Sequence, residues 1–213
     1  MVVSYQFVHM AKRRTVKKAY DELAEDYTDR AGSESSSEPS EPVRRFRDEL
    51  GPEDKLLDAG CGPGGTTLTM AGEAGVGLDI SREQLSLARR TVTGELVQGD
   101  MTELPFATDS FDAISAMYSL IHVPLDKHQA VLAEFARVLR AGGTLLVTEG
   151  GMEWTGSNPN WLDSGTEMHW SMAGLEATRD DLLACGFTIR GVWDIPDPTT
   201  DDGVKPFFLA DLP

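Results

Sequence analysis

Residues 56–65 are Leu56-Leu57-Asp58-Ala59-Gly60-Cys61-Gly62-Pro63-Gly64-Gly65, an apolar strand that leads into a glycine-rich turn. A second apolar run, Val76-Gly77-Leu78-Asp79, ends in a carboxylate. Glycines let backbone N–H groups approach a ligand closely, and an acid about 20 residues beyond such a turn can accept hydrogen bonds from a ribose diol. The two stretches therefore predict a nucleoside-binding cradle at the edge of a parallel sheet.

The glycine spacing alone leaves the cofactor open, because Gly60-x-Gly62-x-x-Gly65 also satisfies the dinucleotide fingerprint. Two acids distinguish the candidates. Asp58 stands just before the first glycine, and a second acidic turn follows at Gly99-Asp100-Met101. A carboxylate repels a pyrophosphate in a partly desolvated site but attracts a cationic amino acid moiety. The acids therefore favour S-adenosylmethionine over a nicotinamide dinucleotide.

Strands and helices alternate along the middle of the chain, which predicts an α/β fold. We expect a three-layer sandwich, with a seven-stranded, mostly parallel sheet and helices on both faces. The expected strands are Lys55–Ala59, Val76–Asp79, Leu96–Gln98, Phe111–Met117, Thr144–Thr148, Phe187–Asp194 and Lys205–Ala210.

The N-terminal part of the chain differs in composition from the rest. Apolar residues recur at helical spacing over Thr15–Arg30, with Tyr20 and Tyr27 on one face. Ala31–Pro42 is rich in Ser, Glu and Pro, which predicts a mobile linker. We therefore divide the chain into a helical lid with its linker, residues 1–50, and a catalytic domain, residues 51–213.

Two later segments carry further expectations. Ala141-Gly142-Gly143 is expected to cap a long helix over Asp126–Arg140. Gly150–Trp170 shows no regular pattern and carries three tryptophans, which predicts a long irregular loop. Such loops are usually functional.

Composition limits the function further. The 213 residues include 35 acidic and 19 basic side chains, a formal net charge of −16, which disfavours a nucleic acid partner. Two cysteines offer no disulfide framework, and no apolar run is long enough to span a membrane. No Cys and His cluster has metal-ligand spacing. We expect a cytoplasmic monomer or homodimer that acts on a small-molecule substrate without a metal and without binding a membrane.

Five sequence blocks carry a resemblance to a known family. They are LLDAGCGPGG (56–65), VGLDIS (76–81), GDMTELPF (99–106), DSFDAISAMYSLIHV (109–123) and LRAGGTLLVTEG (139–150). With these blocks in order and at the family's spacing, the chain resembles the class I (Rossmann-like) S-adenosylmethionine-dependent methyltransferases. The resemblance is to their small-molecule type, of the methyltransferase domain 11 kind, and covers roughly Tyr20 to Cys185.

The resemblance implies a set of cofactor contacts. Asp58 and the turn residues Gly60, Gly62 and Gly64 would hold the methionine moiety, and Asp79 would hold the ribose. Ile80 would cover one face of the adenine, Asp100 would accept from its amine, and the Met101 N–H would donate to its ring. The cofactor set is completed by Met117, which borders the methyl group, and Tyr27, a tyrosine delivered by the lid. Tyr20 could be a lid residue or a core residue.

The acceptor side rests on four residues: Tyr118, His122, His169 and Trp170. His122 follows the strand that borders the methyl group, where an imidazole could take a proton from the acceptor. It could equally shape the pocket or bond to the backbone. Trp170 could enclose the acceptor, or it could anchor the long loop.

The predicted function is methyl transfer from S-adenosylmethionine to a small molecule. A nicotinamide-dependent oxidoreductase is the alternative from another enzyme class, although the Tyr-Lys or Ser-Tyr pair that it typically needs is not found. A non-catalytic module that keeps the fold and binds the cofactor is the other alternative.

Overall fold

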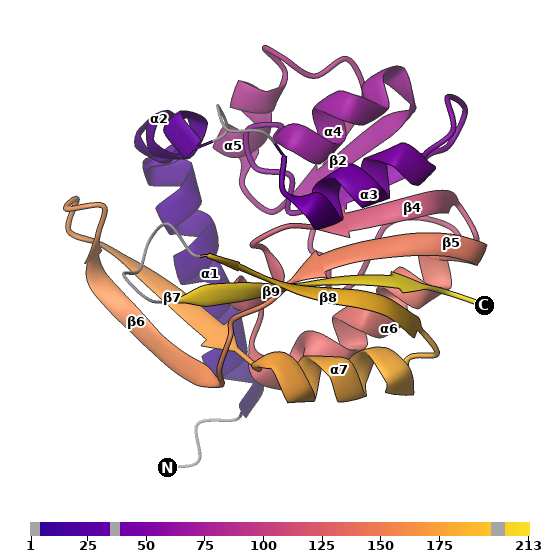
Figure 1. Cartoon of the computed structure of the whole chain (residues 1–213). Helices are drawn as coiled ribbons and strands as arrows, with labels where there is room; N and C mark the ends of the chain where they lie inside the picture. Colours follow the sequence, from indigo (N-terminus) through magenta and orange to yellow (C-terminus); the bar gives the residue numbers. More distant parts are fainter. Residues whose placement is uncertain (1–4, 35–38, 197–202) are drawn as a thin grey trace.

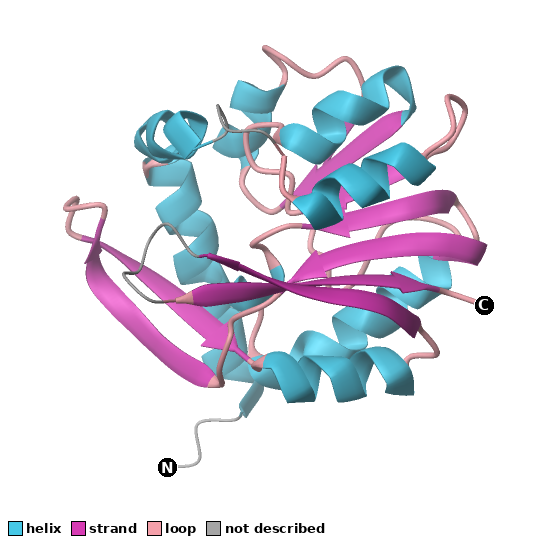
Figure 2. Cartoon of the chain, viewed as in Figure 1, coloured by secondary structure: helices cyan, strands magenta, loops and turns pink. Residues whose placement is uncertain are grey.

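The central feature of the computed structural model is a seven-stranded sheet in the order β3-β2-β1-β4-β5-β9-β8 (Figures 1 and 2). Strands β1 to β5 pair in parallel, and β9 runs antiparallel to both β5 and β8. The structure describes residues 5–34, 39–196 and 203–213. The predicted α/β fold with a seven-stranded, mostly parallel sheet is confirmed.

The elements run in the following order along the chain: α1 (Tyr5–Glu22), α2 (Ala24–Glu34), α3 (Glu41–Glu49), β1 (Leu56–Ala59), α4 (Thr66–Ala71), η1 (Gly72–Ala74), β2 (Gly75–Asp79), α5 (Arg82–Ala88), β3 (Glu95–Gln98), β4 (Phe111–Ala116), η2 (Leu120–His122), η3 (Leu125–Lys127), α6 (His128–Val138), β5 (Leu139–Thr148), β6 (Trp154–Trp161), β7 (Thr166–Met172), α7 (Leu175–Ala184), β8 (Thr188–Pro196) and β9 (Val204–Asp211).

Alternate residues of the buried strands face opposite layers, as the pleat requires. Leu56 of β1 packs in one cluster with Phe46 of α3, whereas Leu57 packs in another with Phe135 of α6. Helices α3, α4 and α5 lie on one face of the sheet, and α6 and α7 lie on the other (Figure 1). The strands are apolar on both sides because both faces are covered.

The N-terminal helix is longer than predicted and is broken. In place of one helix over Thr15–Arg30, α1 begins at Tyr5 and ends at Glu22, and α2 follows after Leu23. The two tyrosines stay together across the break: the ring centroids of Tyr20 and Tyr27 lie 5.1 Å apart. Helix α1 packs against β7 through Val16, Ala19 and Met168.

The predicted linker over Ala31–Pro42 is shortened at both ends. Helix α2 continues to Glu34 and α3 begins at Glu41, while residues 35–38 lie outside the described part of the chain. The division of the chain at residue 50 stays a prediction.

The predicted irregular loop over Gly150–Trp170 is wrong. Strands β6 and β7 form an antiparallel hairpin that projects beside the main sheet (Figure 2). Strand β6 contains Gly156 and Asn158-Pro159-Asn160, which have low strand propensity and hide the strand from a local analysis. Pairing with β7, together with packing of Trp161 and Trp170 against α1, overrides that propensity.

The predicted helix cap at Ala141-Gly142-Gly143 is also wrong. Helix α6 ends at Val138, and these three residues lie inside β5. The Gly142 N–H donates to the Leu212 carbonyl (2.7 Å), and the Leu212 N–H donates to the Gly143 carbonyl (3.0 Å). The chain's C-terminal end therefore pairs with this segment, a contact that local sequence does not reveal.

Candidate cofactor and acceptor site

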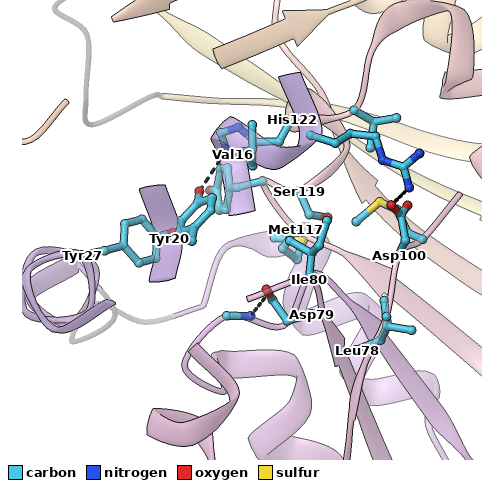
Figure 3. Close-up of a pocket in the computed structure, with 17 residues that line it drawn as sticks. Val16, Tyr20, Tyr27, Leu78, Asp79, Ile80, Asp100, Met117, Ser119 and His122 are labelled. Atoms are coloured by element: carbon cyan, nitrogen blue, oxygen red, sulfur yellow. Dashed lines mark hydrogen bonds and ion pairs between the residues drawn. The ribbon is translucent and has the colours of Figure 1, made fainter. Parts of the chain in front are cut away.

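A pocket lies at the carboxyl edge of the parallel strands, between the sheet and α1 (Figure 3). Ten of the predicted site residues line it. These are Tyr27, Gly60, Gly62, Asp79, Ile80, Asp100, Met101, Met117, Tyr118 and His122. Four other predicted residues, Asp58, Gly64, His169 and Trp170, are not among the lining residues. The position agrees with the general rule that ligands of open α/β sheets bind beyond the strand ends.

The glycine turn is shaped by close contacts. Gly60 has φ 83°, and a Cβ there would lie 2.3 Å from Cβ of Ser119. Gly62 has φ 53° and faces the pocket. Gly64 has φ 87°, and its Cβ would lie 2.4 Å from Val92. Two of these glycines therefore form the pocket wall, while Gly64 is needed for packing behind it.

Asp79 fastens the turn from the end of β2. Its Oδ2 accepts from the Gly62 N–H and its Oδ1 from the Ser81 N–H, both at 2.8 Å. Burial raises the pKa of Asp79 to about 6, against the lowering effect of these two hydrogen bonds. The two carboxylate oxygens have four lone pairs between them, and the backbone N–H groups of Gly62, Ser81 and Ile80 act on them, so acceptor capacity remains for a ligand hydroxyl.

Asp100 lies at the other side of the pocket and pairs with a residue that the sequence analysis did not select. Its Oδ2 forms an ion pair with Arg13 of α1 (Figure 3), and its Oδ1 accepts from the N–H (2.9 Å) and hydroxyl (2.7 Å) of Thr102. Arg13, Val16 and Tyr20 all line the pocket. Their i, i+3, i+7 spacing places them on one helix face and could have identified Arg13.

Asp58 lies behind the turn. It is 3% exposed, and its oxygens accept from the Thr67 and Ser115 hydroxyls, both at 2.9 Å. Burial raises the pKa of Asp58 to about 6, opposed by these two hydroxyls. The observed contacts hold β1, β4 and α4 together, and the contact of Asp58 with a methionine moiety stays a prediction.

His122 and Tyr20 both line the pocket and contact each other. The imidazole Nδ1 lies 2.9 Å from the His169 carbonyl, and Nε2 lies 2.9 Å from the Tyr20 hydroxyl. Because a carbonyl only accepts, Nδ1 carries the proton and Nε2 accepts from Tyr20. Burial lowers the pKa of His122 to about 4, although the bond to His169 opposes this. The imidazole is therefore neutral near pH 7, with the Nε2 lone pair directed at Tyr20 of α1.

The hairpin tryptophans support this arrangement from outside the pocket. The ring of Trp170 lies 5.9 Å from His122, and the ring of Trp161 lies 5.2 Å from Tyr20 and 5.8 Å from Tyr27. His169 contributes its backbone carbonyl, whereas its side chain lies 3.4 Å from Glu167. The hairpin thus anchors α1 over the pocket.

Comparison with known proteins finds a similarity over the middle of the chain. A profile described as a methyltransferase domain matches residues 57–147, which contain Asp58, the glycine turn, Asp79, Asp100 and His122. Over these residues the chain is similar to methyltransferase domains, and its fold is that of solved S-adenosylmethionine-dependent methyltransferases.

Two relatives with the family's activity in their names match parts of the chain. Methyltransferase GfsG of Streptomyces halstedii is 42% identical over 105 residues, 45% of this chain and 37% of the relative. O-methyltransferase cnsE of Penicillium expansum is 34% identical over 160 residues, 63% of this chain and 57% of the relative. The matched region thus spans from about a third to just over half of these relatives' length.

A solved structure shows the same fold. Burkholderia thailandensis 1,6-didemethyltoxoflavin-N1-methyltransferase, solved with 1,6-didemethyltoxoflavin and S-adenosylhomocysteine bound, superposes with a TM-score of 0.72 at 19% identity. The alignment covers 96% of this chain and 90% of that structure.

In residues 5–34, 39–196 and 203–213, no group of three or more His, Cys, Asp or Glu side chains is arranged to hold a metal ion. Over the same residues, no helix is both long and apolar enough to cross a membrane.

Proposed function

We propose that this chain transfers a methyl group from S-adenosylmethionine to a small-molecule acceptor. The observation that carries the proposal is that one pocket unites a turn fastened by Asp79, a second acid at Asp100 and a polar pair, Tyr20 and His122. The first two features suit an adenosine, and the third suits an acceptor beyond it.

The residues present fit the cofactor. The Asp79 carboxylate, which keeps acceptor capacity, suits the ribose hydroxyls, and Ile80 offers an apolar surface to the adenine. Asp100 can accept a hydrogen bond from the adenine amine when its ion pair with Arg13 is broken. Gly62 leaves space for the ligand, because a Cβ there would point into open volume with only the Gln84 amide oxygen within 4 Å. When bound, the cofactor supplies an electrophilic methyl group on a sulfonium.

The chain's own contribution is positioning and exclusion of water. Val16, Met117 and Val123 give the pocket apolar walls, and α1 covers it. Holding two reactants in line can contribute up to about 7–11 kcal/mol to lowering the barrier. At the acceptor end, the neutral Nε2 of His122 can accept a hydrogen bond from an acceptor O–H or N–H that displaces Tyr20. Because the pKa of His122 is low, we assign it to orientation ahead of proton removal.

The two alternatives receive less support. Asp79 and Asp100 present carboxylates on both sides of the pocket, which disfavours a dinucleotide pyrophosphate. A non-catalytic module would not need a polar pair beyond the cofactor. The bound acceptor and S-adenosylhomocysteine in the Burkholderia structure support a fold that places both ligands together.

The test is methyl transfer itself. The purified chain is incubated with methyl-labelled S-adenosylmethionine and a panel of phenols, carboxylic acids, amines and thiols. Label in an organic product, together with stoichiometric S-adenosylhomocysteine, would support the proposal. Failure to bind S-adenosylhomocysteine by calorimetry would contradict it, and tight cofactor binding without transfer to any panel member would favour the non-catalytic module.

A further inference from the structure

Exposed apolar side chains are concentrated beside the pocket. Among the residues whose side-chain exposure the structure describes, five large hydrophobic side chains are more than a third exposed: Tyr118 (38%), Met152 (72%), Trp154 (44%), Leu183 (54%) and Val204 (42%). Leu183 lies at the carboxyl end of α7, away from the β6–β7 hairpin (Figure 1). The other four belong to segments that contact one another next to the pocket, and we call these four residues the apolar strip.

The first half of the apolar strip starts at the pocket wall. Tyr118 lines the pocket, and its ring packs against Phe207 (5.9 Å) beneath the Lys205 ammonium (4.8 Å). Val204 precedes Lys205, and a Cβ on Gly151 would lie 2.7 Å from the Val204 carbonyl oxygen. The segment that carries Met152 therefore lies against the start of β9.

The second half of the apolar strip leads to the pocket through Trp154 and Trp170. Trp154 opens β6 two residues after Met152, and its ring lies 6.4 Å from that of Trp170. The ring of Trp170 lies 5.9 Å from His122, which lines the pocket. Ring contacts and neighbouring residues of the chain thus lead from Tyr118 by way of Val204 and residues 151–154 to Trp170 and His122.

Tyr118 also holds a strained backbone. Its φ is 55°, a backbone conformation that residues other than glycine seldom adopt. Its N–H donates to the Thr148 hydroxyl at 2.6 Å. Strained residues persist where the surrounding structure enforces them, commonly at binding sites. Here the strain leaves an aromatic ring exposed where the pocket meets the strip.

We propose that the methyl acceptor is elongated, with a polar reactive end at Tyr20 and His122 and an apolar tail that lies along the apolar strip. This inference rests on the proposed function. An exposed apolar patch commonly marks a binding site, and because the strip adjoins the pocket we assign the acceptor as its occupant. The chain's net charge of −16 opposes the other apolar candidate, an anionic membrane surface.

The experiment measures how affinity depends on tail length. Para-alkylphenols from ethyl to octyl are titrated into the complex with S-adenosylhomocysteine by calorimetry. A fully buried methylene strengthens binding about fourfold, so a methylene on an open surface should add about twofold. We expect this gain in the parent, and a loss of about fivefold or more for the octyl compound in Met152→Ser and in Trp154→Ser. Ethylphenol affinity should stay nearly unchanged.

The matched control is Leu183→Ser, which removes from α7 an apolar side chain whose exposure (54%) lies between those of Trp154 and Met152. It should keep the full dependence on chain length. Equal affinity for short and long tails, no binding of any alkylphenol, or the same dependence in Met152→Ser and Leu183→Ser would overturn the inference. If the parent does not bind S-adenosylhomocysteine, the proposed function is refuted instead. If methyl transfer occurs but does not depend on tail length, only the proposal that the apolar strip binds the acceptor tail is refuted.

Discussion

Asp79→Asn removes the carboxylate that we assign to the ribose while keeping its size. Charge-assisted hydrogen bonds contribute about 1.5–3 kcal/mol each, so losing the charge should weaken S-adenosylhomocysteine binding by about 10- to 100-fold. The amide NH₂ would also face either the Gly62 or the Ser81 N–H, which now donate to the two oxygens. That mismatch should lower the free energy of unfolding by about 1–3 kcal/mol.

The pH dependence of S-adenosylhomocysteine affinity gives a second test of the role of Asp79. The pKa of Asp79 is raised by burial to about 6, and ribose hydroxyls bind the ionised form best. Affinity in the parent should therefore be full above pH 6 and fall as the pH drops through that value, and it should change less in Asp79→Asn. Calorimetric titration between pH 5 and pH 8 measures this.

The control variant is Asp112→Asn, whose carboxylate accepts from Lys55 and Arg140 away from the pocket. It should bind S-adenosylhomocysteine as the parent does. If Asp79→Asn keeps both the affinity and the pH profile of the parent, Asp79 does not hold the ribose.

Three further predictions follow from the described contacts. Burial raises the pKa of Glu149 to about 7, so its contribution to stability falls as the pH rises from the unfolded value through 7. Glu149 Oε2 lies 3.4 Å from Nδ1 of His128, whose Nε2 lies 2.9 Å from the Val123 carbonyl. In Glu149→Gln the side-chain amide can donate to that Nδ1, as the protonated acid does in the parent. The Tm of the variant should therefore fall less than the Tm of the parent between pH 5 and pH 8. Parallel Tm curves would count against this prediction. Asp100→Ala should weaken S-adenosylhomocysteine binding less than Asp79→Asn and should erode discrimination against S-inosylhomocysteine; unchanged discrimination would show that Asp100 does not contact the adenine edge. Amide exchange in α1 and α2 should slow when S-adenosylhomocysteine binds, with α7 unaffected, whereas equal exchange in both states would make these helices a fixed part of the core.

The sheet was predictable because its strands are short apolar runs between turn residues, a pattern that depends on local sequence. The errors arose where distant segments decide the structure. Strand β6 forms because β7 and α1 cover it, and Gly142 lies in a strand because the C-terminal residues pair with it. The break after Glu22 had no glycine or proline to mark it.

The site was predictable where a residue type is tied to a backbone position. Gly60, Gly62, Asp79 and Asp100 line one pocket, as their places in the motifs required. Arg13 lies outside the five sequence blocks, so no motif identified it as a site residue. The orientation of His122 depends on the His169 carbonyl, a backbone group that side-chain patterns do not reveal.

The most direct test is a crystal structure of the chain with S-adenosylhomocysteine. The account predicts ribose hydroxyls at about 2.6–3.2 Å from the Asp79 carboxylate, the adenine amine at Asp100 in place of Arg13, and the sulfur directed toward Tyr20 and His122. A ligand bound elsewhere, or bound in this pocket without contacting Asp79, would contradict it.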